Sequence, residues 1–153
     1  WKNIQLIKYF FSFKMIIPQI LLTFVMVWGA TAKIFDPCTL SKELKRLGAR
    51  KEDLGHWMCI VKHESTFNTS AVGSLNEDGS KDWGLFQVND NWWCKSEKRK
   101  SSNGCKTACK ALLSDDITAA FKCALKVKEE QGFKAWVAWV NRCQNIKHKE
   151  NYC

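Results

Sequence analysis

The chain has 153 residues, of which 46% are hydrophobic and 25% are charged, and this fits one globular domain rather than a repeat or low-complexity protein. Lys and Arg outnumber Asp and Glu by 24 to 15, so the formal net charge is +9. This charge favours anionic partners, namely bacterial walls, anionic membranes or nucleic acid. No basic stripe with interleaved aromatic residues is present, which argues against a nucleic-acid partner.

The first 32 residues have the features of a secretory leader. An apolar run from Met15 to Trp28 is followed by Ala30-Thr31-Ala32, which forms a small-residue cleavage site before Lys33. The run is shorter than the roughly 20 residues of a membrane span, and a proline and a glutamine interrupt it. We therefore predict translation from Met15, cleavage before Lys33, no stable membrane anchoring, and a secreted, extracellular domain over residues 33–153.

Two helices are predicted next. Leu40, Leu44 and Leu47 recur at helical spacing, and Gly48 follows as a stop signal. Asp53 is placed to cap a second helix that ends near Glu64. The apolar face of this second helix comprises Leu54, Trp57, Met58 and Val61. The dipole at the C-terminal end of a helix disfavours a negative charge, which helps to raise the pKa of a carboxyl group there.

A loop and a strand follow the second helix. Residues 66–80 are rich in Asn, Ser, Thr and Gly, and Asp78-Gly79 indicates a tight turn. Residues 82–89 mix aromatic and β-branched side chains and predict a strand. Residues 95–106 carry the basic run Lys98-Arg99-Lys100, which we interpret as part of a solvated loop.

The C-terminal part is predicted to be helical again. Ser114-Asp115-Asp116 is placed to open a third helix, and a short fourth helix holds Trp136, Trp139 and Val140. The buried face of the third helix comprises Ile117, Ala120, Phe121, Ala124 and Leu125. A small sheet inserted between helices divides a domain into two lobes, and the groove between lobes suits an extended ligand.

Eight cysteines lie after position 37, namely Cys38, Cys59, Cys94, Cys105, Cys109, Cys123, Cys143 and Cys153. An even number in a secreted chain indicates four disulfides, although the spacing alone leaves their pairing open. A metal site would rest on Cys105-x-x-x-Cys109, which lacks a second cysteine pair or a histidine pair at zinc-finger spacing. We therefore favour disulfides and expect no metal and no cofactor.

Two acidic residues stand out because they lie in different settings only eighteen positions apart. Glu64 ends an apolar helical pattern, whereas Asp82 enters a predicted strand after a turn. Two carboxyl groups in such different environments can have different pKa values, and glycoside hydrolysis requires that difference. Either acid alone would more often be an ordinary surface residue.

Several segments together resemble the c-type (chicken-type) lysozymes along essentially all of residues 33–153, and most closely the insect members. The matching segments are 33–38, 64–69, 79–89, 92–94, 111–119 and 135–143. The resemblance implies an α+β fold with a helical lobe, a small antiparallel β-sheet lobe, a cleft between them and four disulfides. The implied pairs are Cys38–Cys153, Cys59–Cys143, Cys94–Cys109 and Cys105–Cys123.

The resemblance also implies an activity and its residues. Glu64 is the expected general acid and Asp82 the expected nucleophile or charge stabiliser in a retaining glycoside hydrolase. Its expected substrate is the β-1,4 bond between N-acetylmuramic acid and N-acetylglucosamine in bacterial peptidoglycan, in antibacterial defence. Trp136 is expected to form an apolar wall beside Glu64, and Ser80 belongs to the polar surroundings of Asp82. Substrate contacts are expected from Asn76, Gln87, Asn89, Trp92, Trp93, Ala135 and Trp136.

The resemblance further bears on metals and on assembly. Asp115-Asp116 suggests calcium, but Lys110 and Leu112 occupy the places of further acidic ligands in the calcium-binding relatives, so we expect no calcium site. We expect a monomer.

Two other functions remain open from the sequence. The first is a non-catalytic carbohydrate-binding member of the lysozyme and lactalbumin fold, although such members typically lose one or both acids. The second is a cationic membrane-lytic protein that needs no catalytic chemistry. Replacing Glu64 by glutamine separates hydrolysis from both alternatives.

Overall fold

The computed structural model describes residues 33–146 and Cys153. The predicted leader over residues 1–32 lies outside the described residues, so its cleavage before Lys33 stays a prediction. No helix within the described ranges is long and apolar enough to cross a membrane.

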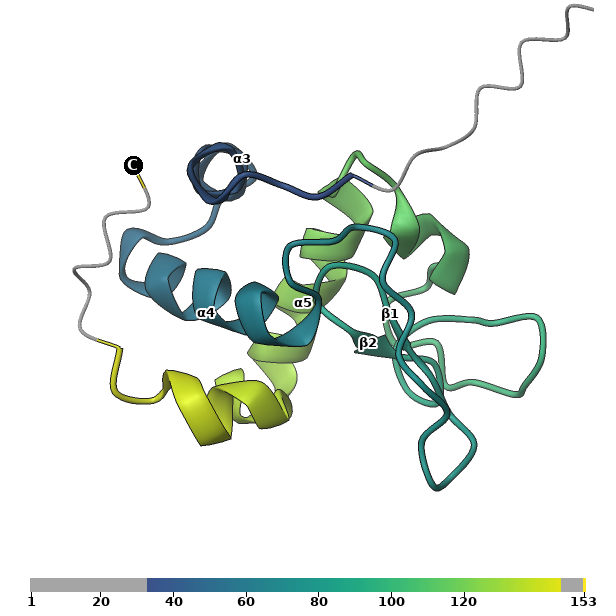
Figure 1. Cartoon of the computed structure of the whole chain (residues 1–153). Coiled ribbons are helices and arrows are strands. Elements are labelled where there is room, and N and C mark those ends of the chain that lie inside the picture. The colour runs from purple at the N-terminus through teal and green to yellow at the C-terminus, as the bar shows by residue number, and fades with distance from the viewer. Residues whose placement is uncertain (1–32, 147–152) are drawn as a thin grey trace, which may run out of the picture. The chain divides into compact units, whose positions relative to one another are not determined.

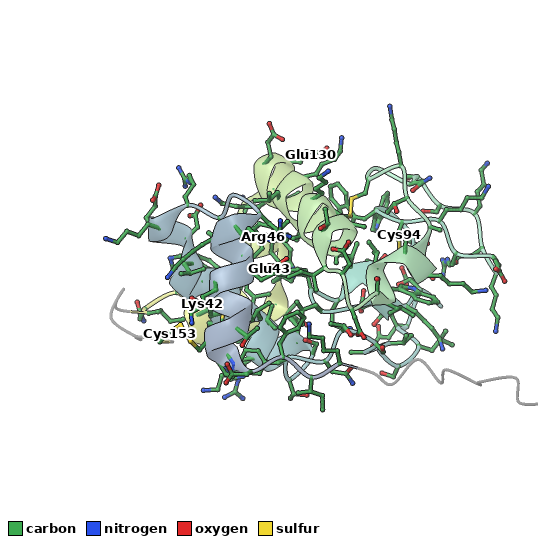
Figure 2. All side chains as sticks on the ribbon, turned by 90° about the horizontal axis from the view of Figure 1, so that it is seen from above. Lys42, Glu43, Arg46, Cys94, Glu130 and Cys153 are labelled. Atoms are coloured by element: carbon green, nitrogen blue, oxygen red, sulfur yellow. A yellow bond between two sulfur atoms is a disulfide. The ribbon has the colours of Figure 1, made fainter. Side chains whose placement is uncertain are left out.

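The first helix of the domain, α3, spans Pro37–Arg46. Its start is fixed by the Asp36 carboxylate, which accepts a hydrogen bond from the Thr39 N–H at 2.9 Å. Leu40 and Leu44 are fully buried, as the helical spacing predicts. Gly48 follows with a φ of +95°, a conformation that glycine adopts without strain. Figure 2 shows Lys42, Glu43 and Arg46 on this helix, with the last two forming an ion pair at 2.6 Å.

The second helix, α4, spans Leu54–Glu64 and follows a 3₁₀ turn over Lys51–Asp53. The prediction that Asp53 caps this helix is wrong, because its side chain accepts no hydrogen bond from the first turn. The Asp53 carboxylate instead pairs with Arg50 at 2.7 Å and with Lys128 of the later helix α5 (Thr118–Gln131). Burial is the largest single influence on the pKa of Asp53 and raises it, but the hydrogen bonds and charges of Arg50 and Lys128 together outweigh burial and lower the pKa. A long-range ion pair thus replaces the local cap.

The predicted strand over residues 82–89 is two short strands. β1 (Asp82–Trp83) and β2 (Val88–Asn89) pair antiparallel, with Asp82 opposite Asn89. The chain reverses at Gly84, which has a φ of +75° and lies so close to Leu112 that a Cβ atom would be 2.2 Å from the Leu112 carbonyl oxygen. The reversal lets Leu85 and Phe86 enter the core. The mixture of aromatic and β-branched residues in segment 82–89 did not reveal this reversal of the chain.

The third helix, α5, spans Thr118–Gln131, so it begins two residues after the predicted opening. Asp116 acts ahead of the helix, because its carboxylate accepts a hydrogen bond from the Thr118 N–H at 3.0 Å. A 3₁₀ turn over Cys109–Leu113 precedes it. The predicted fourth helix is a 3₁₀ turn over Phe133–Ala135 and a π-helical turn over Trp139–Cys143. Figure 1 shows these C-terminal turns, in yellow-green, beside α4.

The apolar core is centred on Trp57 of α4, whose side chain is fully buried. Its ring meets four other rings in edge-to-face contacts, with centroid distances of 4.8 to 5.7 Å. These rings belong to Phe86, Phe121, Phe133 and Trp136. The core therefore joins α4, α5, the segment between the two strands and the C-terminal turns.

Four disulfides cross-link the domain, and they are the four pairs that the resemblance implies: Cys38–Cys153, Cys59–Cys143, Cys94–Cys109 and Cys105–Cys123. The second ties α4 to the π-helical turn. The last two anchor the long loop that follows β2, one across its own base and the other to α5. The loop is thus held covalently at its base and against α5.

Candidate active site

Glu64 is the last residue of α4 and lines a cleft. One carboxyl oxygen, Oε1, accepts a hydrogen bond from the Ala138 N–H at 3.3 Å. Burial raises the pKa of Glu64, and the negative charge of Asp82 adds to the rise, while the Ala138 hydrogen bond opposes it. The protonated form of Glu64 is therefore favoured relative to an exposed glutamate.

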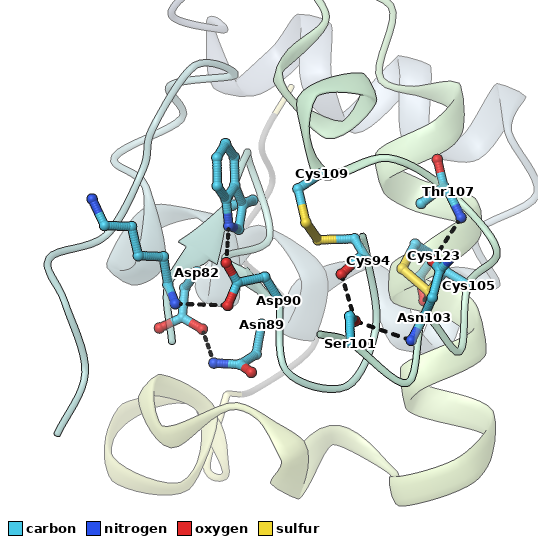
Figure 3. Close-up of a disulfide and its surroundings, with 12 residues drawn as sticks. Asp82, Asn89, Asp90, Cys94, Ser101, Asn103, Cys105, Thr107, Cys109 and Cys123 are labelled. Carbon is cyan, nitrogen blue, oxygen red and sulfur yellow. Dashed lines mark hydrogen bonds between the residues drawn. A yellow bond between two sulfur atoms is a disulfide. The ribbon is translucent and has the colours of Figure 1, made fainter. Parts of the chain in front are cut away.

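Asp82 opens β1 and lies in polar surroundings. Its two carboxyl oxygens each accept one side-chain amide hydrogen bond, from Asn76 at 3.0 Å and from Asn89 at 2.8 Å. The same two amides also donate to the hydroxyl of Ser80, at 3.0 and 2.9 Å. Asn89 reaches Asp82 because the two residues are partners in the β1–β2 register (Figure 3). The carboxylate is thus fixed in orientation from both sides.

The two acids line one cleft with a volume of about 320 Å³. Its walls come from the end of α4, from β1 and β2, from the C-terminal half of α5 and from the turn after α5. The other lining residues are Gln87, Val88, Asn89, Trp93, Val127, Gln131, Ala135, Trp136 and Val137. Five of the seven predicted substrate-contacting residues are in this set, namely Gln87, Asn89, Trp93, Ala135 and Trp136.

Trp136 contributes an apolar wall to the cleft. Its indole N–H donates to the backbone carbonyl of Phe86 at 2.8 Å, and one side of its ring meets Trp57. The side chain is buried, and its one donor is already used. Trp136 is therefore suited to exclude water from the cleft rather than to bind a sugar hydroxyl.

The other two predicted contact residues do not line the cleft. Asn76 supports Asp82 through its amide, as described above. Trp92 is 61% exposed and lies along a neighbouring hollow with Lys100, Ser101 and Ser102. Contacts from all seven residues to substrate remain predictions.

Three residues next to the acids have strained backbone conformations. Thr66 and Phe67 follow Glu64 with φ values of +50° and +65°, and Gln87 has a φ of +48°. Residues other than glycine rarely adopt this region, and such strain clusters at functional sites. The Gln87 amide donates to the Gly84 carbonyl at 2.8 Å, which stabilises the reversal between the strands.

Some residues of the cleft were missed by sequence reasoning. The Ala138 N–H that contacts Glu64 is a backbone group, so no side-chain pattern could reveal it. Val127 lies three residues after Ala124 on the buried face of α5, and continuing the periodicity would have found it. Gln131 is exposed and polar, so the apolar pattern gave no signal for it.

The acidic pair before α5 is engaged in hydrogen bonds within the fold, long-range for Asp115 and local for Asp116. Asp115 accepts hydrogen bonds from the Lys33 N–H at 3.2 Å and from the Thr69 hydroxyl at 2.9 Å, and Asp116 accepts from Thr118. Among the residues that the structure describes, no group of three or more His, Cys, Asp or Glu side chains is arranged to hold a metal.

Comparisons with known proteins place this arrangement in a family. The model of the C-type lysozyme/alpha-lactalbumin family matches residues 33–153. The chain belongs to this family. Lysozyme P of Drosophila melanogaster is 46% identical over 109 residues, which cover 71% of this chain and 77% of that protein. Lysozyme c-1 of Anopheles gambiae is 47% identical over 118 residues, which cover 77% and 82%.

A solved structure agrees with the sequence comparisons. Lysozyme from Equus asinus has a TM-score of 0.73 at 41% identity, with 77% of this chain and 95% of that chain covered. The predicted membership of the C-type lysozyme family, its likeness to insect members and the lysozyme fold are confirmed.

Proposed function

We propose that this member of the C-type lysozyme family is a secreted lysozyme. In this proposal it hydrolyses the β-1,4 bonds between N-acetylmuramic acid and N-acetylglucosamine in peptidoglycan, with retention of configuration. Glu64 is the general acid, and Asp82 is the nucleophile or charge stabiliser. The named relatives above are lysozymes, and both acids that the activity needs are present in the chain.

The observation that carries the proposal is the contrast between the two acids across one cleft. Burial raises the pKa of Glu64 and favours its protonated form, whereas the two oxygens of Asp82 each accept a side-chain amide hydrogen bond. Lysozymes are the type case of this division between a proton donor and an ionised partner. The site thus supports general acid catalysis next to a fixed negative charge.

The first step breaks the glycosidic bond. Glu64 donates its proton to the bridging oxygen, which leaves with the electron pair of the broken C1–O bond. Positive charge develops at C1 and the ring oxygen, and the Asp82 carboxylate stabilises it or forms a covalent bond to C1. Trp136 and the other apolar side chains of the cleft limit the water that could compete.

The second step uses the same residues in reverse roles. Glu64, now ionised, removes a proton from a water molecule, and the oxygen of that water bonds to C1 as the bond or contact to Asp82 is lost. The water attacks the face that the leaving group occupied, so configuration at C1 is retained. Glu64 regains its proton and Asp82 its charge.

Secretion and a wall substrate fit other properties of the chain. Four disulfides are typical of proteins from oxidising compartments. Residues 1–32 carry three lysines and no acidic residue, so the net charge of +9 becomes +6 for residues 33–153. This charge attracts the domain to the anionic bacterial surface, in keeping with antibacterial defence. Salt should weaken this attraction.

The deciding experiment compares the wild-type protein with Glu64→Gln on insoluble peptidoglycan. We expect the release of soluble fragments to fall by about 10²- to 10⁴-fold, because glutamine cannot donate the proton. Co-sedimentation with the wall should persist. Glu130→Gln, which changes the charge by the same amount at the end of α5, should release fragments at the wild-type rate.

Two outcomes would contradict the proposal. Equal fragment release by wild type and Glu64→Gln would exclude Glu64 as the acid, and binding without any release by wild type would indicate a non-catalytic carbohydrate-binding protein. Bacterial killing that Glu64→Gln leaves intact would point to membrane disruption.

A further inference from the structure

A second cavity, of about 300 Å³, lies on the opposite side of β1 from the cleft. Successive residues of a strand point to opposite faces, so Asp82 lines the cleft while its neighbour Trp83 lines this cavity. We name the cavity the Trp83 pocket. In the view of Figure 3, Asp90, which also lines it, lies between Asp82 and the Cys94–Cys109 disulfide.

The walls of the Trp83 pocket are held in place by the fold. Val72 pairs with Trp83 in an isolated antiparallel bridge, and Lys95 pairs with Ala108 in a parallel one. The Cys94–Cys109 disulfide lies directly beside the second bridge. Asp90 fixes the indole ring, because its carboxylate accepts a hydrogen bond from the Trp83 N–H at 3.2 Å. The pocket is therefore preformed.

Part of the pocket wall is apolar and open to solvent. Val72 is 42% exposed and Leu75 is 65% exposed, and both lie with Trp83 in the lining. Exposed apolar side chains around a cavity are characteristic of ligand sites. A flat or aliphatic group would cover them.

The rim of the pocket has an excess of positive charge. Five cations line it, namely Lys81, Lys95, Lys98, Arg99 and Lys110, against the two carboxylates of Asp90 and Glu97. Asp90 accepts hydrogen bonds from Trp83 and from the Lys81 N–H, and Glu97 pairs with Lys110 at 2.7 Å. Within the described part of the chain, the ammonium groups of Lys81, Lys95 and Lys98 form no ion pair.

Two buried polar groups at the pocket have no hydrogen-bond partner within the described residues. The Ser96 hydroxyl belongs to a residue that is only 8% exposed, and the Nε of Arg99 is likewise buried. The Arg99 Nε lies 3.9 Å from Asp90 Oδ1, which is too far for a hydrogen bond. Buried donors in folded proteins nearly always have a hydrogen-bond partner, and a bound acceptor would provide one for the Ser96 hydroxyl and for the Arg99 Nε.

We propose that the Trp83 pocket binds a small amphipathic anion, a class of ligand separate from the glycan of the cleft. The apolar body of the ligand lies against Trp83, Val72 and Leu75. Its phosphate, sulfonate or carboxylate head accepts hydrogen bonds from Ser96 and Arg99 and is surrounded by the lysines of the rim. Neutral glycans lack the charge that this site requires.

The test is titration of the folded protein with 1-naphthyl phosphate, followed by calorimetry and by NMR shifts of the indole N–H groups. We expect saturable binding with a Kd on the order of 0.5 mM, as the size of the ligand suggests. 1-Naphthol and inorganic phosphate, which each supply half of the ligand, should bind at least about tenfold more weakly. A chitin oligosaccharide in the cleft should not displace the ligand.

Matched variants separate a built site from general charge attraction. Arg99→Gln and Ser96→Ala should each weaken binding, by about tenfold and about threefold, respectively. Lys122→Gln, an exposed α5 residue with the same charge change as Arg99→Gln, should leave the Kd unchanged. The NMR spectrum of each variant verifies folding, and Lys95→Gln provides a second rim substitution should Arg99→Gln unfold.

The proposal is overturned if no binding is detected with 1-naphthyl phosphate at a concentration of about 5 mM, which is tenfold above the expected Kd. It is also overturned if Lys122→Gln weakens binding as much as Arg99→Gln, or if the shifts arise at Trp136 rather than Trp83. Fragment release from peptidoglycan by Arg99→Gln should equal that of wild type, so failure at this pocket is distinguishable from failure of the proposed lysozyme activity.

Discussion

The helical part of the domain and the part around β1 and β2 are stabilised in different ways. α3, α4 and α5 bury apolar faces around Trp57, and their contacts are mainly between side chains without charge. The strands are only two residues long each, and side-chain hydrogen bonds and the Cys94–Cys109 disulfide hold the surrounding loops. Asp82, Asp90 and Ser80 are each central to such a polar network.

This difference places the two carboxyl groups of the cleft in different environments. Glu64 comes from the apolar part, where burial raises its pKa. Asp82 comes from the polar part, where two amides compensate its charge. The cleft lies where the two kinds of interior meet, so the chemistry proposed for it depends on both.

The largest expected effect on stability is in the apolar part. Trp57→Ala removes the ring that contacts four others, and we expect the free energy of unfolding to fall by about 3–5 kcal/mol. Chemical denaturation measures this loss. Trp92→Ala removes the same side chain from a largely exposed position and should change stability by less than about 0.5 kcal/mol. Similar losses for the two variants would refute the assignment of the core.

The next largest effect on stability is expected from removing the Cys94–Cys109 disulfide, which supports the part around β1 and β2. Replacing Cys94 and Cys109 together by alanine should lower the free energy of unfolding by about 2–4 kcal/mol, because the unfolded loop gains freedom. The backbone N–H at position 109 donates to the Lys95 carbonyl in wild type and should be the first to lose protection from hydrogen exchange in the variant. An equal loss of protection in α4 would contradict the conclusion that this disulfide mainly supports the part around β1 and β2.

A smaller effect, on the rate of hydrolysis, is expected from removing the Asn89 side-chain amide, which contacts Asp82. Asn89→Ala removes a hydrogen bond to the Asp82 carboxylate, worth about 1.5–3 kcal/mol. We expect kcat on peptidoglycan to fall by about tenfold to a hundredfold with little change in KM, if Asp82 acts in the transition state. Asn91→Ala is the matched control, since its amide contacts Asp78 instead. Equal rates for Asn89→Ala and wild type would remove Asn89 from the proposed mechanism.

The most subtle effect is the pH dependence of stability at Glu64. Below its ordinary pKa of 4.5 the glutamic acid is neutral in both states, so Glu64→Gln should be as stable as wild type. As the pH rises through the raised pKa of the folded state, wild type must bury a charge and the glutamine variant need not. The variant should therefore become the more stable protein towards neutral pH. Thermal unfolding across this range measures the difference, and a constant difference would contradict it.

The sequence anticipated much of the helical part because its signals are local. The spacing of Leu40 and Leu44 predicted the buried face of α3, and Gly48 marked its end. The buried residues of α5 also follow the expected period, from Ile117 to Ala124. A helix that buries one face repeats its apolar residues at fixed intervals, and these intervals can be read without a partner.

In both parts of the domain, features that depend on distant partners were harder to anticipate. Aspartate commonly caps the start of a helix, yet the carboxylate of Asp53 binds Lys128, which lies seventy-five positions away in the sequence. The reversal at Gly84 depends on the close approach of Leu112, which no pattern within residues 82–89 could express.

For this protein the sequence by itself determined the helices α3, α4 and α5, the presence of four disulfides and, through its resemblance to a family, the choice of Glu64 and Asp82 as the candidate acids. Only the tertiary structure decided what surrounds those acids. The proton affinity of Glu64 depends on burial and on an N–H from Ala138, and the orientation of Asp82 depends on Asn76 and Asn89. Such properties arise from atoms that the fold brings together, so they exist only once the chain is folded.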